Sequence, residues 1–144
     1  MQIENLFIAD ANPDTTFIES AQNKGINTIV SRTCLDTIAQ LEKVFKLPNV
    51  VILLGQSFPD DPDAFKKITQ KIDYLPLYDS DNPTIISVSN RVQQLDDDYS
   101  FDYSNGLNDL FVRLIRIKEN DKERTKVKHS FSRIPIGDVL KVNW

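Results

Sequence analysis

The chain has 144 residues, of which 40% are hydrophobic and 26% charged, so it is long enough for one domain with a buried core. Its formal net charge is −4, and residues 119–144 hold six basic and four acidic residues, which leaves −6 on the first 118 residues. An acidic body repels a phosphate backbone, so we expect no direct nucleic-acid binding by this chain alone.

Several other classes of protein are excluded by what the sequence lacks. No apolar run approaches the roughly 18 residues of a membrane span, and Met1–Asn5 has no basic region, so we expect a cytoplasmic protein without membrane association. The single Cys34 allows no internal disulfide and is expected to be buried. With His129 as the only histidine, the chain lacks a thiol–imidazole metal site, and we expect no metal and no cofactor.

The N-terminal segment predicts a strand followed by a helix. Leu6–Ala9 is a short apolar run that ends at Asp10. Asn12-Pro13 then predicts a helix N-cap followed by proline at the first helical position. Gly25 is suited to the left-handed residue that ends such a helix.

The next segment repeats this order. Ile26–Val30 predicts a second strand, and Thr33 with Asp36 three residues later resembles a capping box that opens a second helix. The stripe of this helix that faces the sheet is predicted from helical spacing to contain Leu35, Ile38, Ala39, Glu42 and Phe45.

The centre of the chain carries the clearest strand. Val50–Leu54 is a run of five apolar residues between Pro48-Asn49 and Gly55, which predicts a strand buried on both faces. In open parallel sheets the ligand or the chemistry lies just beyond the carboxyl ends of the strands, so residue 55 should face a functional site. A glycine offers no chemical group at this position.

The second half of the chain continues the alternation. Asp61-Pro62 predicts the start of a third helix, Thr84–Val88 a fourth strand and Tyr99–Tyr103 a fifth strand. The last helix has the cleanest apolar stripe, which contains Leu107, Leu110, Phe111, Leu114 and Ile117.

This alternation predicts an α/β fold with a five-stranded parallel sheet in the flavodoxin-like order 2-1-3-4-5. Between Ser89 and Asp98 there is too little chain for two loops and an average helix of about 11 to 12 residues. We therefore expect the fourth helix of this pattern to be shortened or missing.

Three segments resemble the receiver domains of response regulators, which have the CheY-like fold. Leu6–Asp14 resembles their first strand and acidic loop, and Leu53–Asp60 resembles their phosphoacceptor strand and loop. Asp97-Asp98-Tyr99, followed by Leu107–Lys118, resembles their fifth strand and last helix. The resemblance covers residues 4–118 and implies two-component signal transduction.

The same resemblance implies a phosphorylation site that is degenerate in this chain. A receiver needs two acidic residues for Mg²⁺, an acceptor aspartate, a hydroxyl and a lysine, because phosphoryl transfer needs a nucleophile, a metal and groups that hold the product. These positions align with Asp10, Ala11, Gly55, Ser87 or Ser89, and Asp102. Since the second acidic residue, the acceptor and the lysine are absent, we expect no phosphorylation. Asp60 and Asp61 are expected to cap the helix that follows Pro62 rather than to replace the acceptor.

The last helix is the expected contact surface. Val112 and Ile115 lie off its buried stripe, next to the sheet edge that a missing fourth helix would expose, with Arg113 and Arg116 as further interface candidates. The alternative is that residues 129–144 fold back and cover this face. We divide the chain into a receiver-like domain, residues 1–118, and a charged linker with a short β-like tail, residues 119–144, which either docks on the body or opens an output domain.

Two classes of function follow. The favoured one is a pseudo-receiver without enzymatic turnover, a phosphorylation-independent interaction or dimerisation domain of a bacterial-type signalling or transcription regulator. The alternative is a flavodoxin-like small-ligand-binding or enzymatic domain, but the chain has four glycines, none of them in a phosphate-binding cluster. A receiver that is still phosphorylated is a third hypothesis.

Overall fold

The computed structural model describes residues 3–75, 83–88 and 98–123. Three predictions fall outside these residues: the shortened fourth helix between Ser89 and Asp98, the hydroxyl of Ser89, and the tail from residue 124 onward.

The described residues form a five-stranded sheet with the order β2-β1-β3-β4-β5, in which every neighbouring pair of strands is parallel. This confirms the flavodoxin-like α/β fold. The elements are β1 (Asn5–Ala9), α1 (Thr15–Asn23), β2 (Asn27–Ser31), α2 (Cys34–Phe45), β3 (Val50–Leu54), α3 (Ala64–Tyr74), β4 (Thr84–Val88), β5 (Ser100–Phe101), the 3₁₀ turn η2 (Tyr103–Asn105) and α4 (Gly106–Glu123).

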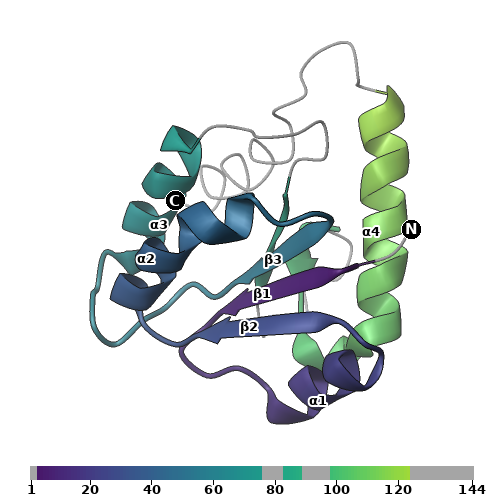
Figure 1. Ribbon diagram of the computed structural model, residues 1–144, viewed down its shortest axis with the longest axis horizontal. Coiled ribbons are helices and arrows are strands. Elements are labelled where there is room, and N and C mark those ends of the chain that lie inside the picture. The colour runs from purple at the N-terminus through teal and green to yellow at the C-terminus, as the bar shows by residue number, and fades with distance from the viewer. Residues whose placement is uncertain (1–2, 76–82, 89–97, 124–144) are drawn as a thin grey trace.

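Helices cover both faces of the sheet (Figure 1). The helices α2 and α3 pack on one face together with Phe7, Ile52 and Ile85. The helices α1 and α4 pack on the other face together with Leu6, Leu53 and Ile86. Because successive side chains of a strand point to opposite faces, the central strand β3 supplies both layers, and all five of its residues are buried, as the apolar run predicted.

The structure corrects two predictions, one on the start of α1 and one on the buried face of α2. The N-cap of α1 is Asp14, whose carboxylate accepts a hydrogen bond from the backbone N–H of Phe17 at 3.0 Å, so the predicted cap at Asn12 was two residues early. The N-cap of α2 is Thr33, as predicted. The predicted sheet-facing stripe of α2 is confirmed only in part. Phe45 is buried and Ile38 is partly buried, but Leu35, at 78%, Ala39 and Glu42 are exposed. The buried residues of α2 are Cys34, Thr37, Leu41, Val44 and Phe45.

The end of the described chain is organised by α4. Its predicted stripe is confirmed, with Leu107, Leu110, Leu114 and Ile117 buried and Phe111 partly buried. The strand β5 is shorter than the predicted Tyr99–Tyr103, because Tyr103 already belongs to η2. Gly106, with φ +85°, joins η2 to α4 in a backbone conformation that other residues rarely adopt. The helix continues past residue 118 to Glu123.

Candidate functional site

The carboxyl end of the sheet brings two of the predicted site residues together. Asp10 follows β1 and Gly55 follows β3, and these strands are neighbours with Ala9 paired to Leu54. A Cβ atom added to Gly55 would lie 2.8 Å from Oδ1 of Asp10 and 3.2 Å from its Cα. Asp10 therefore occupies the space in front of Gly55, which is where a longer residue at position 55 would place its side chain.

The carboxylate of Asp10 is held on both oxygens. Its Oδ1 accepts a hydrogen bond from the backbone N–H of Asn12 at 3.1 Å, and its Oδ2 accepts one from the hydroxyl of Tyr103 at 2.7 Å. The backbone N–H of Asp10 donates to the carbonyl of Ser31 on β2. Asp10 thus links β1, β2 and the residues that follow β5.

Tyr103 is the site residue that the sequence did not reveal. Its ring lies 5.4 Å from that of Phe17 on α1 and 6.3 Å from that of Phe101 on β5. Burial, and then the hydrogen bond to Asp10, raise the pKa of its hydroxyl above the ordinary value of 10.0, so the group remains a donor. The aromatic alternation of Tyr99, Phe101 and Tyr103 was visible in the sequence. Nothing in it connected Tyr103 to a carboxylate 93 positions earlier.

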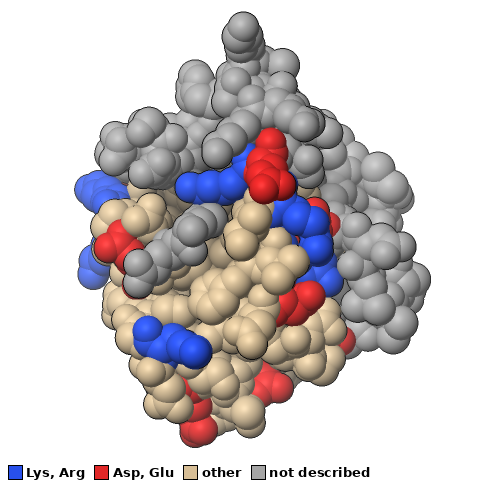
Figure 2. Space-filling model, turned by 90° about the vertical axis from the view of Figure 1, so that its right-hand side faces the viewer, with Lys and Arg blue, Asp and Glu red and all other residues tan. Residues whose placement is uncertain are grey.

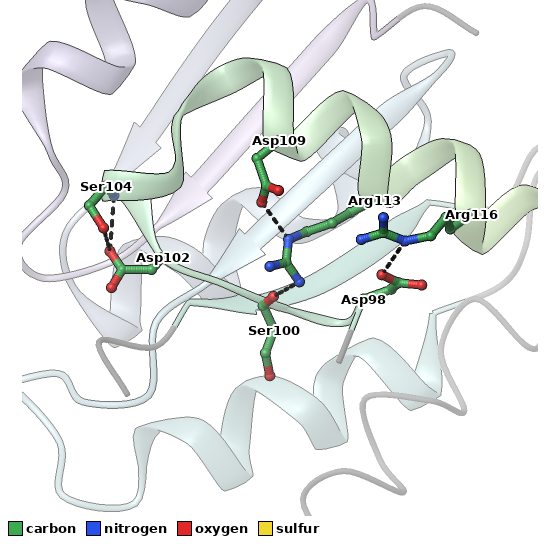
Figure 3. A network of polar contacts seen from close by, with 7 residues as sticks. All are labelled: Asp98, Ser100, Asp102, Ser104, Asp109, Arg113 and Arg116. Atoms are coloured by element: carbon green, nitrogen blue, oxygen red, sulfur yellow. Dashed lines mark hydrogen bonds and ion pairs between the residues drawn. The ribbon is translucent and has the colours of Figure 1, made fainter. Parts of the chain in front are cut away.

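Asp102 lies at the position where the receiver resemblance implies a lysine. Its carboxylate accepts hydrogen bonds from the backbone N–H of Ser104 at 2.9 Å and from the hydroxyl of Ser104 at 3.0 Å (Figure 3). It therefore caps η2 and bonds locally. Within the described residues, neither the carboxylate of Asp10 nor that of Asp102 is bonded to a Lys or Arg side chain.

Ser87 and Ala11 belong to the other face of the sheet. The hydroxyl of Ser87 is buried and accepts a hydrogen bond from the side-chain amide of Gln56 at 3.0 Å. Because Ser87 alternates with Ile86, it shares the face of Ile85, which is covered by α2 and α3. Ala11 is partly buried against the same layer and brings no carboxylate to it. The structure thus separates Ser87 from the Asp10–Gly55 contact.

Of the two acidic residues before Pro62, only Asp60 has partners that differ from those predicted. The Oδ1 of Asp61 accepts a hydrogen bond at 2.8 Å from the backbone N–H of Asp63, the N-cap of α3. Asp60 accepts hydrogen bonds from the backbone N–H groups of Cys34 at 2.9 Å and Leu35 at 3.2 Å, so it caps α2 rather than α3. Both bonds lower the pKa of Asp60, and the bond from Cys34 has the larger effect. Asp61 pairs with Lys67 at 2.5 Å, which is the main reason why the pKa of Asp61 is lowered.

Cys34, whose backbone N–H donates to Asp60, is buried as expected. Burial, followed by the charges of Asp61 and Asp60, raises the pKa of its thiol. Among the residues that the structure describes there is no group of three or more His, Cys, Asp or Glu side chains able to hold a metal ion. In the same part of the chain no helix is long and apolar enough to cross a membrane.

The expected contact surface on α4 is only partly as predicted. Val112 is 46% and Ile115 47% exposed, off the buried stripe, and Arg116 lies beside them in an ion pair with Asp98 at 2.7 Å. Arg113 does not belong to this surface, because it is 2% exposed and its guanidinium points inward to Asp109 and Ser100. Figure 2 shows the molecule from the side on which α4 lies in Figure 1. The centre of this view is a broad area without charged side chains, and Lys, Arg, Asp and Glu lie mainly around it.

Comparison of the chain with models of protein families, with curated proteins and with solved structures finds no match in any of the three.

Proposed function

We propose that this chain is a pseudo-receiver domain, which acts without phosphorylation as an interaction or self-association domain of a bacterial-type signalling or transcription regulator. The observation that carries the proposal is the contact between Asp10 and Gly55. A receiver would place its acceptor carboxylate and the phosphoryl group at this point, whereas here the chain's own Asp10 fills the space and is bonded to Tyr103.

The surroundings of Asp10 support the same proposal. Asp102 lies where the resemblance implies a lysine, and its negative charge would repel a phosphate. Ser87, one of the two hydroxyl positions that the resemblance implies, is bonded to Gln56 on the other face of the sheet. Since Asp10 and Ser87 are bonded within the domain, the recognition groups that we propose are exposed side chains. Val112 and Ile115 on α4 are such groups.

The first prediction tests the absence of phosphorylation. We expect no phosphate adduct in the intact mass of the protein after incubation with acetyl phosphate and Mg²⁺, because position 55 has no carboxylate to attack the phosphoryl group. A receiver domain that retains its acceptor aspartate, treated in parallel, is the positive control.

A stoichiometric adduct would contradict the proposal. Asp60→Asn and Asp61→Asn variants would then show whether either of these carboxylates accepts the phosphate. Binding of a small molecule that protects the amides of Asp10 and Gly55 from hydrogen exchange would instead favour the alternative, a flavodoxin-like ligand-binding domain.

A further inference from the structure

Asn105 is the one asparagine of the chain that is followed by a glycine, and the two residues form the junction between η2 and α4. The side-chain amide of an asparagine can be attacked by the backbone nitrogen of the next residue, because this attack closes a five-membered ring. A side chain on the next residue hinders the attack, and glycine has none. Other exposed asparagines in the described helices and strands precede residues with side chains: Asn23, Asn27 and Asn108.

The backbone at this junction requires the glycine. Gly106 has φ +85°, a conformation that residues with a side chain rarely adopt. Apart from its own helix and its chain neighbours, no heavy atom lies within 4 Å of the place that a Cβ would take. The space beside Gly106 is therefore open, and the pair Asn105-Gly106 is part of the turn itself.

Asn105 and Gly106 are held by the hydrogen bonds of one short turn. The backbone N–H of Asn105 donates to the carbonyl of Asp102 at 2.9 Å, and that of Gly106 donates to the carbonyl of Tyr103. The carboxylate of Asp102 bonds within the same turn, to Ser104 (Figure 3). Asn105 is itself partly exposed. The nitrogen of Gly106 is therefore freed when this turn opens, which costs less free energy than unfolding of the sheet.

We propose that Asn105 is a site of spontaneous modification, at which the asparagine converts to aspartate and isoaspartate. The nitrogen of Gly106 forms a bond to Cγ of Asn105, the bond from Cγ to Nδ2 breaks, and ammonia leaves with the proton of the Gly106 amide. Water then opens the resulting succinimide. Addition of water at Cγ gives aspartate, and addition at the backbone carbonyl carbon gives isoaspartate. The inference does not rest on the proposed function, because it follows from the chemistry of two adjacent residues.

The two products differ in their effect on the junction. Both add a negative charge at the start of α4, where the N–H groups of the first turn favour an anion. Isoaspartate also adds one methylene group to the main chain between η2 and α4. Tyr103, whose hydroxyl donates to Asp10, lies two residues earlier. We therefore expect the isoaspartate form, and not the aspartate form, to weaken the contact between Tyr103 and Asp10.

The test is incubation of the folded full chain near neutral pH, followed by anion-exchange chromatography of the intact protein. We expect two new species with one additional negative charge each, which contain aspartate and isoaspartate at position 105 in peptide maps. A sample digested without incubation controls for conversion during digestion. Asn105→Gln should lose both species, because attack on its longer side chain would have to close a six-membered ring.

Two results would overturn the assignment of the site. One is an unchanged Asn105 in the folded chain after the same residue has converted in the chain unfolded in urea. The other is faster conversion of Asn108, which is exposed on α4 but precedes Asp109.

Asn105→Asp is the matched control for the charge, because it carries the new carboxylate on an unchanged main chain. We expect amide exchange in residues 103–107 to be faster by on the order of tenfold in the purified isoaspartate species than in Asn105→Asp. Equal exchange in these two proteins would overturn the expected effect on Tyr103.

Discussion

Asp10 and Gly55 depend on each other. Gly55 is not in the left-handed region of backbone conformation, so alanine could adopt its backbone angles, but its Cβ would lie 2.8 Å from Oδ1 of Asp10. Movement of the carboxylate would disturb its bonds to Asn12 and Tyr103, and the Cα of Asp10 would still lie 3.2 Å from the added Cβ. The glycine is therefore required by the contact with Asp10 and not by a turn.

We expect Gly55→Ala to lower the free energy of unfolding by about 1–3 kcal/mol, the usual cost of overpacking a buried position. Urea unfolding measures the change. In an Asp10→Ala background the same substitution should cost clearly less, because the carboxylate is gone. An equal cost in both backgrounds would show that the contact with Asp10 is not the reason for the glycine.

Tyr103 should make the stability depend on pH in alkaline solution. Its pKa is raised in the folded state, so its contribution is complete below the unfolded pKa of about 10 and is lost as the pH rises toward the folded pKa. In this range the folded state binds more protons than the unfolded state, and the free energy of unfolding should fall by up to about 1.4 kcal/mol per pH unit.

Urea unfolding between pH 9 and 11 measures this slope. Tyr103→Phe should reduce it to the part contributed by Cys34, whose pKa is also raised, whereas Tyr74→Phe, at a tyrosine that is 87% exposed, should leave it unchanged. If the slope of Tyr103→Phe equals that of the unchanged protein, other groups cause it and the hydrogen bond to Asp10 does not account for the pH dependence.

At the scale of elements, the loop after β3 holds the start of α2. The four N-terminal N–H groups of a helix have no partners within the helix, and Asp60 accepts two of those at the start of α2 while Thr33 accepts a third. At the start of α3, the N-cap Asp63 makes no side-chain cap hydrogen bond. The two helices are thus capped by different means.

Asp60→Ala should speed amide exchange at Cys34 and Leu35, because their N–H groups lose their acceptor. The pKa of Asp60 is lowered, so its contribution to stability is present above its unfolded pKa of about 3.9 and is lost as the pH falls through the folded value. Asp63→Ala is the matched control and should leave α2 unchanged. Faster exchange of α3 rather than α2 in Asp60→Ala would contradict the observed cap.

At the scale of the whole molecule, two regions differ in what they offer to a partner. Asp10 fills the space in front of Gly55 at the carboxyl end of the sheet, whereas the flank of α4 presents Val112 and Ile115. Under the proposed function, self-association should therefore depend on the flank of α4.

We expect light scattering to show a dimer for the chain and a folded monomer for the Val112→Glu, Ile115→Glu double variant, because two carboxylates cannot be buried unpaired at an interface. The matched control is Leu35→Glu with Tyr74→Glu, which charges two exposed apolar positions, 78% and 87% exposed, on α2 and α3. A monomer in every case would contradict self-association through α4. A dimer that only the control variant disrupts would place the interface on the other face.

The sequence by itself determined the order of the elements, the parallel sheet and the buried stripe of α4, because strand and helix periods and turn residues are local signals. It also located Asp10 and Gly55, since both directly follow strands. Local signals failed for Leu35, because the buried stripe of α2 runs through Cys34, Thr37, Leu41 and Val44 and leaves Leu35 in solvent.

Only the tertiary structure decided how residues distant in the sequence meet. Tyr103 reaches Asp10, Asp60 reaches the start of α2, and Arg113 turns from the flank of α4 to the carbonyl of Ser100. Each of these contacts gives a polar group a hydrogen-bond partner, and the partner is chosen by proximity in space. For this reason the candidate site could be located from the sequence, but the bonds that fill it could not.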